Sequence, residues 1–184
     1  MVRFAKSIVF HLTPAILVVL GITAVAGPID LRLLTGIAIG SLLLDIDHWL
    51  FIFVVAPHEL VSREIRSRLS SGSYATAVDY MVVHRRDFRR LPLHSVAFQL
   101  CLAAAALYAT VQTPNTLTAG LMTGLFLHSV VDQAGDLNRT GHLHHWFWVT
   151  GRQAYTSTQK TYFILALTAL SLVLAISLSK GPYA

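Results

Sequence analysis

The sequence has few charged residues and a single cysteine, and both shortages narrow the class of protein. Only 12% of its 184 residues are charged, whereas 54% are hydrophobic. That balance leaves too few polar side chains to cover a surface in water. The lone Cys101 excludes an intramolecular disulfide and a metal site built of thiolates. We therefore expect an integral membrane protein, and the chain length predicts a single transmembrane domain over residues 1–184.

Several common catalytic motifs are also absent. The chain has no Gly-x-Ser-x-Gly elbow, no P-loop and no Gly-x-Gly-x-x-Gly, so serine-nucleophile and nucleotide-dependent mechanisms lack support. The net charge of +5 would suit nucleic acid, but basic residues beside membrane spans more often set topology and contact anionic headgroups. We expect membrane lipids, and no nucleic acid, as partners of these charges.

Five apolar stretches approach the length of about 20 residues that a helix needs to cross a bilayer. They predict an all-α polytopic bundle with spans at about residues 8–26, 33–56, 94–111, 117–133 and 161–179. Gly36 and Gly40 in the second span, and Gly120 and Gly124 in the fourth, form GxxxG patterns, which let helix backbones approach closely. The second and fourth spans are therefore predicted to pack centrally.

Lys and Arg are distributed unevenly between the segments that join these spans. With the N-terminus in the cytoplasm, the inner segments, including 57–93 and 134–160, hold twelve Lys and Arg residues, and the outer segments hold only Arg32 and Lys180. Because Lys and Arg favour the cytoplasmic side, we predict a cytoplasmic N-terminus and an external C-terminus. Within the first long inner segment, Glu59–Leu69 is basic and amphipathic, which predicts a short helix along the inner surface.

The first span has an alternative interpretation as a cleavable signal peptide. Arg3 and Lys6 precede an apolar run that ends in Ala24-Val25-Ala26, a pattern typical of such peptides. A histidine and a proline inside the apolar run are unusual for a signal peptide, and the length of the run suits a full span. We therefore prefer a span that is retained.

Ionisable side chains inside and beside the spans gather on the predicted cytoplasmic side. The candidates in or at the ends of spans are His11, Asp45, Asp47, His48, His94, His128 and Asp132. A charged side chain within the bilayer costs about 2.5 kcal/mol or more, so such residues normally face the interior of a bundle and have a function. Their clustering at one depth predicts a functional site there.

The spacing of these residues suits a divalent metal ion. Asp45 and His48 are three residues apart, and His128 and Asp132 are four apart, so each pair lies on one face of a helix. Imidazole and carboxylate together suit zinc or another first-row ion, and the set could hold one to three ions. Such an ion polarises a phosphoryl or carbonyl oxygen. The alternative is a buried polar network that joins helices without metal.

Two further residues are candidates for catalytic roles. Asp47 points roughly 200° away from Asp45 around a helix, so it could orient a ligand or act as a general base, and it could bind metal only if the helix is irregular. Arg85 belongs to a basic group with Arg86, Arg89 and Arg90. A guanidinium can hold a substrate phosphate, although stop-transfer charge and lipid contact explain most of this group equally well.

At these residues the sequence resembles a known family. The strings Leu44-Asp45-Ile46-Asp47-His48, His84-Arg85, His94-Ser95 and His128-Ser129-Val130-Val131-Asp132 are similar to motifs of the LexA-binding, inner-membrane-associated hydrolases, also called membrane-bound metal-dependent hydrolases. The resemblance covers most of residues 11–148. It implies His11 and His84 as further metal ligands and a location in a bacterial inner membrane. That family is distantly similar to zinc-dependent phospholipase C, which implies phosphoester hydrolysis.

The sequence departs from the family pattern at three places. Leu44 stands where the family has proline, Leu93 stands where it has threonine, and His84 and His94 are ten residues apart where the family has about five. The longer spacing puts His84 in doubt as a ligand.

The leading hypothesis is a metal-dependent hydrolase at the cytoplasmic face that acts on a phosphoester, with a phospholipid as one candidate substrate. One rival is a metal or proton transporter, because intramembrane Asp and His also mark ion pathways. The other is a non-enzymatic scaffold that docks a cytoplasmic partner through the basic segment. The sequence gives no indication of the oligomeric state.

Overall fold

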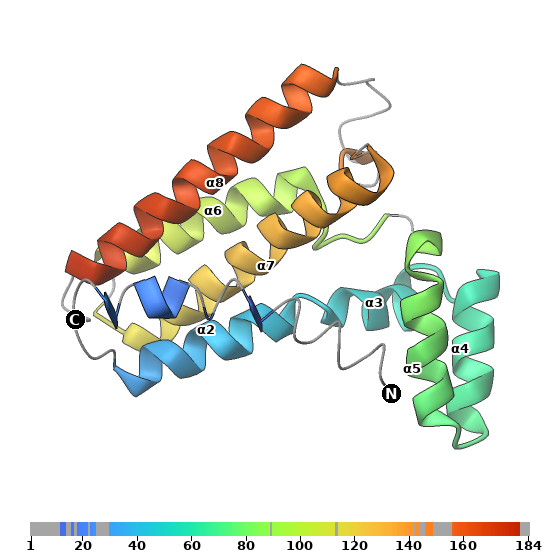
Figure 1. The fold of residues 1–184 in the computed structure, drawn as a ribbon. Helices are drawn as coiled ribbons and strands as arrows, with labels where there is room; N and C mark the ends of the chain where they lie inside the picture. The colour runs from blue at the N-terminus through green and yellow to red at the C-terminus, as the bar shows by residue number, and fades with distance from the viewer. Residues whose placement is uncertain are drawn as a thin grey trace.

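The computed structural model describes residues 12–13, 16, 18–21, 23–24, 30–88, 90–112, 114–141, 143, 146–148 and 156–180. Every regular element in these residues is helical, which confirms the all-α class. The long elements are α2 (Leu31–Leu43), continued by α3 (Ile46–Leu50) and a π-helix (Phe51–Val55), together with α6 (Val96–Gln112), α7 (Thr116–Thr140) and α8 (Ser157–Lys180). A hairpin of α4 (Leu60–Ser70) and α5 (Tyr74–Val83) stands at one end of this bundle (Figure 1).

The long helices alternate in direction. Figure 1 shows α2 and α7 running one way, and α6 and α8 running the other way. As a result α3 ends, α6 begins, α7 ends and α8 begins at the end of the bundle that carries the α4–α5 hairpin. The connections that the sequence predicts to be cytoplasmic therefore lie at one common end.

Two of the described helices are long and apolar enough to cross a membrane. They are Leu31–Val55, with 25 residues, and Thr161–Leu178, with 18, while Val96–Gln112 is apolar but shorter. By length and composition the described residues thus contain two candidate membrane-spanning helices, and the predicted bundle of five spans is not confirmed. Most of the predicted first span, including His11, lies outside the described residues.

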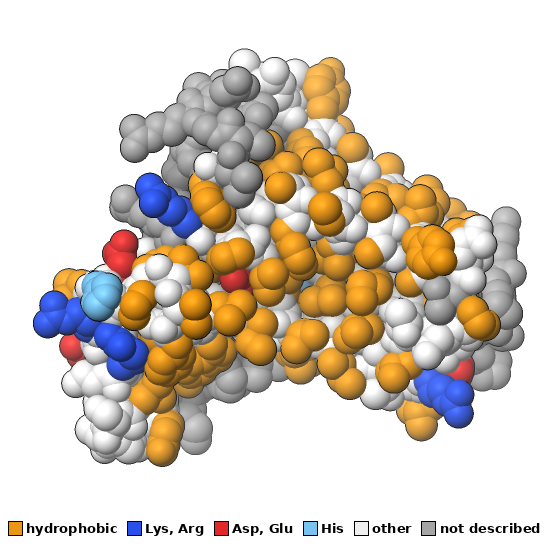
Figure 2. Space-filling view, turned by 180° about the vertical axis from the view of Figure 1, so that it is seen from behind, with side chains coloured by type: hydrophobic (Ala, Val, Ile, Leu, Met, Phe, Trp, Pro, Cys, Tyr) orange, Lys and Arg blue, Asp and Glu red, His pale blue; other side chains and the backbone are white. Residues whose placement is uncertain are grey.

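The surface of the bundle is apolar over its middle. Figure 2 shows hydrophobic side chains covering the centre of one face, with Lys and Arg side chains at its two edges. The exposed apolar residues include Ile39 on α2, Phe53 on the π-helix, and Leu165 and Leu172 on α8, each with between 48% and 62% of its surface accessible. A broad apolar surface of this kind is typical of a protein in contact with lipid or a partner.

The predicted packing of the two GxxxG helices is present. Gly36 and Gly40 of α2 face Gly120 and Gly124 of α7, and all four are buried. A Cβ atom added at Gly40 would meet the backbone oxygen of Leu121, and one added at Gly124 would meet the backbone oxygen of Ile37. The two backbones are therefore in direct contact, as small residues at such an interface allow.

The fourth predicted span is longer than the sequence indicates. Its apolar run ends near Gln133, but α7 continues for two further turns to Thr140. Gly141, with a φ of 69°, then ends the helix in the left-handed conformation, which glycine adopts at helix C-termini without steric cost. The start of the predicted segment 134–160 is therefore helical.

The amphipathic segment forms the first helix of the α4–α5 hairpin. Its apolar residues Val61 and Ile65 are buried against Phe51 and Ile52 of the π-helix. The apolar face of this helix is therefore covered by the protein itself. This packing fixes the end of α5, and with it Arg85, close to the ends of the long helices.

Candidate metal centre

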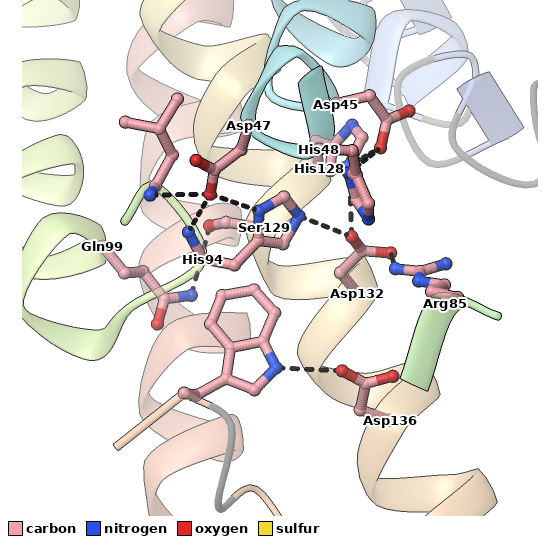
Figure 3. A network of polar contacts seen from close by, with 12 residues as sticks. Asp45, Asp47, His48, Arg85, His94, Gln99, His128, Ser129, Asp132 and Asp136 are labelled. Carbon is pink, nitrogen blue, oxygen red and sulfur yellow. Dashed lines mark hydrogen bonds and ion pairs between the residues drawn. The ribbon is translucent and has the colours of Figure 1, made fainter. Parts of the chain in front are cut away.

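Four of the predicted site residues converge at the end of the bundle that carries the hairpin. One ligand atom from each of Asp45, His94, His128 and Asp132 lies within 4.8 Å of the others. Asp45 comes from the junction of α2 and α3, His94 from the loop before α6, and the other two from α7 (Figure 3). His94, His128 and Asp132 are buried. Segments far apart in the sequence therefore contribute to one compact cluster.

The spacing inside the cluster fits a small metal ion. His94 Nε2 and His128 Nε2 lie 3.1 and 3.3 Å from Asp132 Oδ2, and His128 Nε2 lies 3.7 Å from Asp45 Oδ1. Around a tetrahedral zinc ion with bonds of about 2.0 to 2.1 Å, neighbouring ligand atoms are about 3.3 Å apart. The cluster could therefore hold one divalent ion if the more widely spaced ligand atoms, which are up to 4.8 Å apart, move closer together.

The hydrogen bond of His128 on its other side fixes its tautomer. His128 Nδ1 lies 2.6 Å from the backbone oxygen of Ser41, and a carbonyl oxygen can only accept. Nδ1 must therefore carry a proton and donate it to Ser41. In the neutral ring this leaves the lone pair of Nε2 directed at Asp132, which is the state in which histidine binds a metal.

The carbonyl of Ser41 is accessible because the second helix is interrupted. α2 ends at Leu43, and Leu44 and Asp45 form a turn before α3 begins. The last carbonyls of a helix have no partner further along it, so Ser41 can accept from α7. The same turn brings Asp45 to the cluster.

Asp47 accepts a hydrogen bond from Nδ1 of His94, as the Ser41 carbonyl does from Nδ1 of His128. Its Oδ2 lies 3.2 Å from His94 Nδ1 and also accepts the backbone N–H groups of Leu93, at 2.8 Å, and His94, at 3.1 Å. A buried carboxylate that holds a histidine in this way orients the ring and increases its basicity toward a metal. Asp47 thus lies behind the cluster and positions a ligand, one of the roles expected from its place on the helix.

Arg85 neutralises the buried carboxylate of Asp132. Its Nη2 lies 2.6 Å from Asp132 Oδ1, while Oδ2 of the same carboxylate faces the two histidines. Burial by itself lowers the pKa of Arg85, but the charge and hydrogen bond of Asp132 outweigh burial and raise this pKa. Arg85 therefore stays charged and leaves one oxygen of Asp132 for the centre of the cluster.

His48 lies beside the cluster rather than within it. It is buried, its Nδ1 is 3.8 Å from Asp45 Oδ1, and its ring meets that of His94 edge-on with 5.4 Å between centroids. It also lines a cavity of about 180 Å³ together with Arg85 and His94. The structure thus places His48 in contact with the space next to the four-residue group.

His84 is directed to a different partner. Its Nδ1 lies 2.9 Å from Asp87 Oδ2, and its ring stacks on Tyr80 with 4.1 Å between centroids. The short helical turn Arg85–Asp87 that follows α5 brings the aspartate to this histidine. The structure therefore pairs His84 with Asp87 and leaves it out of the four-residue group, as the altered spacing to His94 suggested.

Two groups near the cluster are not among the site residues predicted from the sequence. The Ser41 carbonyl is a backbone atom that any residue type would supply. Asp136, one helical turn beyond Asp132, accepts a hydrogen bond from Trp146 Nε1 at 3.0 Å and pairs with Arg139 at 3.3 Å. Its spacing of four from Asp132 would have been the only clue, and it becomes visible once α7 is known to continue past Gln133.

Comparisons with models of protein families, with curated proteins and with solved structures found no match for this chain.

Proposed function

We propose that this chain is a membrane-embedded, metal-dependent hydrolase that acts on a phosphoester at the end of the bundle carrying the hairpin. One observation carries the proposal. Two histidines direct Nε2 at a buried carboxylate, and each is held from behind by a fixed acceptor, the Ser41 carbonyl and the Asp47 carboxylate. The carboxylate and the two Nε2 atoms require positive charge between them, and a divalent ion would supply it in place of a proton on each ring.

Asp45, His94, His128 and Asp132 would hold the ion, which we propose to be zinc or another first-row divalent metal. Two imidazoles and two carboxylates suit this class of ion. When bound, the ion would supply Lewis-acid polarisation of a phosphoryl oxygen and would lower the pKa of water. Asp47 would keep His94 in its ligating tautomer, and the Ser41 carbonyl would do the same for His128.

The residues that line the cavity are suited to handle substrate. Arg85 faces the cavity and is charged, so its guanidinium would pair with phosphate oxygens while it keeps Asp132 oriented. His48 faces the same space from within 3.8 Å of Asp45. We propose that His48 transfers protons to and from the reacting groups, as histidine commonly does.

The direction of the helices supports the proposed topology. With a cytoplasmic N-terminus, the second and fourth spans both run inward, and α2 and α7 run in the same direction in the bundle. The cluster and the basic hairpin would then lie at the cytoplasmic face. We propose membership of the LexA-binding, inner-membrane-associated hydrolases on the residues quoted above, and hence a bacterial inner membrane.

The close contact of α2 and α7 favours an enzyme over a transporter. Beyond the cluster these two backbones touch at Gly36, Gly40, Gly120 and Gly124, so an ion could not leave the cluster between them. A transporter needs a continuous polar path across the membrane. Metal flux into proteoliposomes would contradict this argument.

The proposal can be tested by assaying purified protein in lipid nanodiscs on a chromogenic phosphomonoester and a chromogenic phosphodiester. We expect hydrolysis that a chelator abolishes and added zinc or manganese restores. Asp132→Asn should lower the rate by at least 100-fold, because it removes a ligand charge from the centre. His58→Ala is the matched control, since His58 is exposed and lies outside the cluster. Hydrolysis at a rate that neither the chelator nor Asp132→Asn changes would refute a metal-dependent hydrolase at this cluster.

A further inference from the structure

The cavity beside the cluster is lined by two chemically different sets of side chains. His48, Arg85 and His94, together with Asp136 and Arg139 of α7, are polar, and two of them border the candidate metal ligands because His94 belongs to the cluster and Arg85 pairs with Asp132. Val82, Val83, Phe88 and Leu91 are apolar, and Phe88 and Leu91 are buried. The cavity therefore suits a ligand that has both a polar and an apolar part.

The apolar set of side chains continues to the surface of the protein. Val82 and Val83, at the end of α5, line the cavity, and 54% of the surface of Val83 is accessible. The apolar part of a ligand could therefore reach the surface past Val83 while its polar end stays next to Arg85.

The size of the cavity limits what it can enclose. Its volume of about 180 Å³ is below the range of about 300 to 1,000 Å³ that is typical of sites that bury a whole small ligand. The cavity therefore suits a small polar group and only the beginning of a chain. The rest of a longer chain would have to lie outside, over Val83.

We propose that the substrate is a single amphiphile, a phosphate ester with a long alkyl chain. Arg85 holds its phosphate, and Val82, Val83, Phe88 and Leu91 select for its chain. This inference rests on the proposed function, because it assigns a substrate class to the same site. Val82 and Val83 are specificity residues that act on the chain and do not touch the reacting atoms.

Trp146 provides a direct reporter, because it lines the cavity and is buried. Dodecyl phosphate brominated on its chain should quench the Trp146 fluorescence of the protein in zwitterionic nanodiscs. Unlabelled dodecyl phosphate should reverse the quenching with a Kd at least tenfold lower than that of butyl phosphate or inorganic phosphate. Trp146→Phe should remove most of the quenching. This result would distinguish ligand bound in the cavity from brominated ligand that only partitions into the lipid.

Val83, the exposed apolar side chain at the opening, provides the decisive variants. Val83→Asp should raise the Kd for dodecyl phosphate by at least tenfold and leave the Kd for inorganic phosphate unchanged. Val83→Ser, a milder change, should act in the same direction if Val83→Asp fails to fold. Leu60→Asp is the matched control, because Leu60 is also exposed on the hairpin but does not line the cavity.

Failure of this inference is distinguishable from failure of the proposed function. Equal Kd values for dodecyl phosphate, butyl phosphate and inorganic phosphate, in protein that contains metal and hydrolyses the chromogenic esters, would overturn the amphiphile and leave the hydrolase intact. A chain-length preference that depends on Val83 in protein without hydrolysis would support the amphiphile site and overturn the hydrolase.

Discussion

The two halves of the α2–α7 pair differ in what lies between the helices. In one half, four glycines bring the backbones into contact and no side chain intervenes. In the other half, α2 is interrupted at Leu44 and Asp45, and histidine and aspartate side chains from both helices face each other. The same two helices therefore form a close contact and a polar site. The position of the interruption in α2 determines where the glycine contact ends and the polar site begins.

The largest effect on stability is expected in the glycine half. Gly40→Ala would place a Cβ against the backbone oxygen of Leu121, and backbone atoms cannot rotate away. We expect a loss of about 2 to 3 kcal/mol in the free energy of unfolding, typical of overpacking, measured by denaturation in mixed micelles.

Gly21→Ala is the matched control, because nothing lies within 4 Å of a Cβ added there. It should be neutral or stabilise the helix by up to about 1 kcal/mol, since alanine has the higher helix propensity. Equal losses in the two variants would show that the glycine contact does not hold the helices together.

In the polar half, the residue behind His94 should control metal affinity without ligating. Asp47→Asn keeps the shape of the side chain but removes the charge that orients His94. We expect metal affinity to fall by about 10- to 100-fold, as for other residues that hold a metal-bound histidine. Isothermal titration with zinc would measure this, with Asp79→Asn as a control on α5. An unchanged affinity would mean that Asp47 does not position His94.

A smaller effect is expected where the two helices begin. Asp30 accepts the backbone N–H of Arg32 and the hydroxyl of Thr116, and both hydrogen bonds lower its pKa, that of Arg32 more. Because the folded-state pKa is the lower one, this contribution is fully present above the pKa of an unfolded aspartate and is lost as the pH falls through the folded-state value. Asparagine also caps helices well, so Asp30→Asn keeps the helix cap and removes only the charge of the side chain.

The melting temperature of the native protein should therefore exceed that of Asp30→Asn by a few degrees at neutral pH. The difference should shrink between about pH 5 and pH 3, where aspartates titrate. A difference that stays constant over this range would show that the charge of Asp30 contributes nothing to holding the two helix starts together.

Local patterns in the sequence were sufficient to predict several of these features. The GxxxG spacing predicted the close pair of helices, and the spacing of four between His128 and Asp132 predicted that both would serve one site. Both patterns depend only on the periodicity of a single helix. The angle of Asp47 around the helix predicted only that it points away from Asp45, and it left open whether Asp47 orients a ligand, acts as a general base or binds metal.

Features that depend on contacts between distant segments could not be predicted in the same way. The interruption of the second helix occurs without proline, and the acceptor that it frees on Ser41 is a backbone atom. His84 was a candidate ligand by motif, but Asp87, three residues away, pairs with it in the folded chain. The two charges Arg85 and Asp132 meet only because the hairpin packs on the π-helix.

The central claim is most directly tested by measuring the metal content of protein purified in lipid nanodiscs without added metal or chelator. We predict about one zinc or similar divalent ion per chain in the native protein and in His58→Ala. The double variant His128→Ala and Asp132→Asn should contain less than a tenth of that amount while it keeps its helical content. A native protein without stoichiometric metal, which also fails to take up zinc or manganese, would contradict the metal centre.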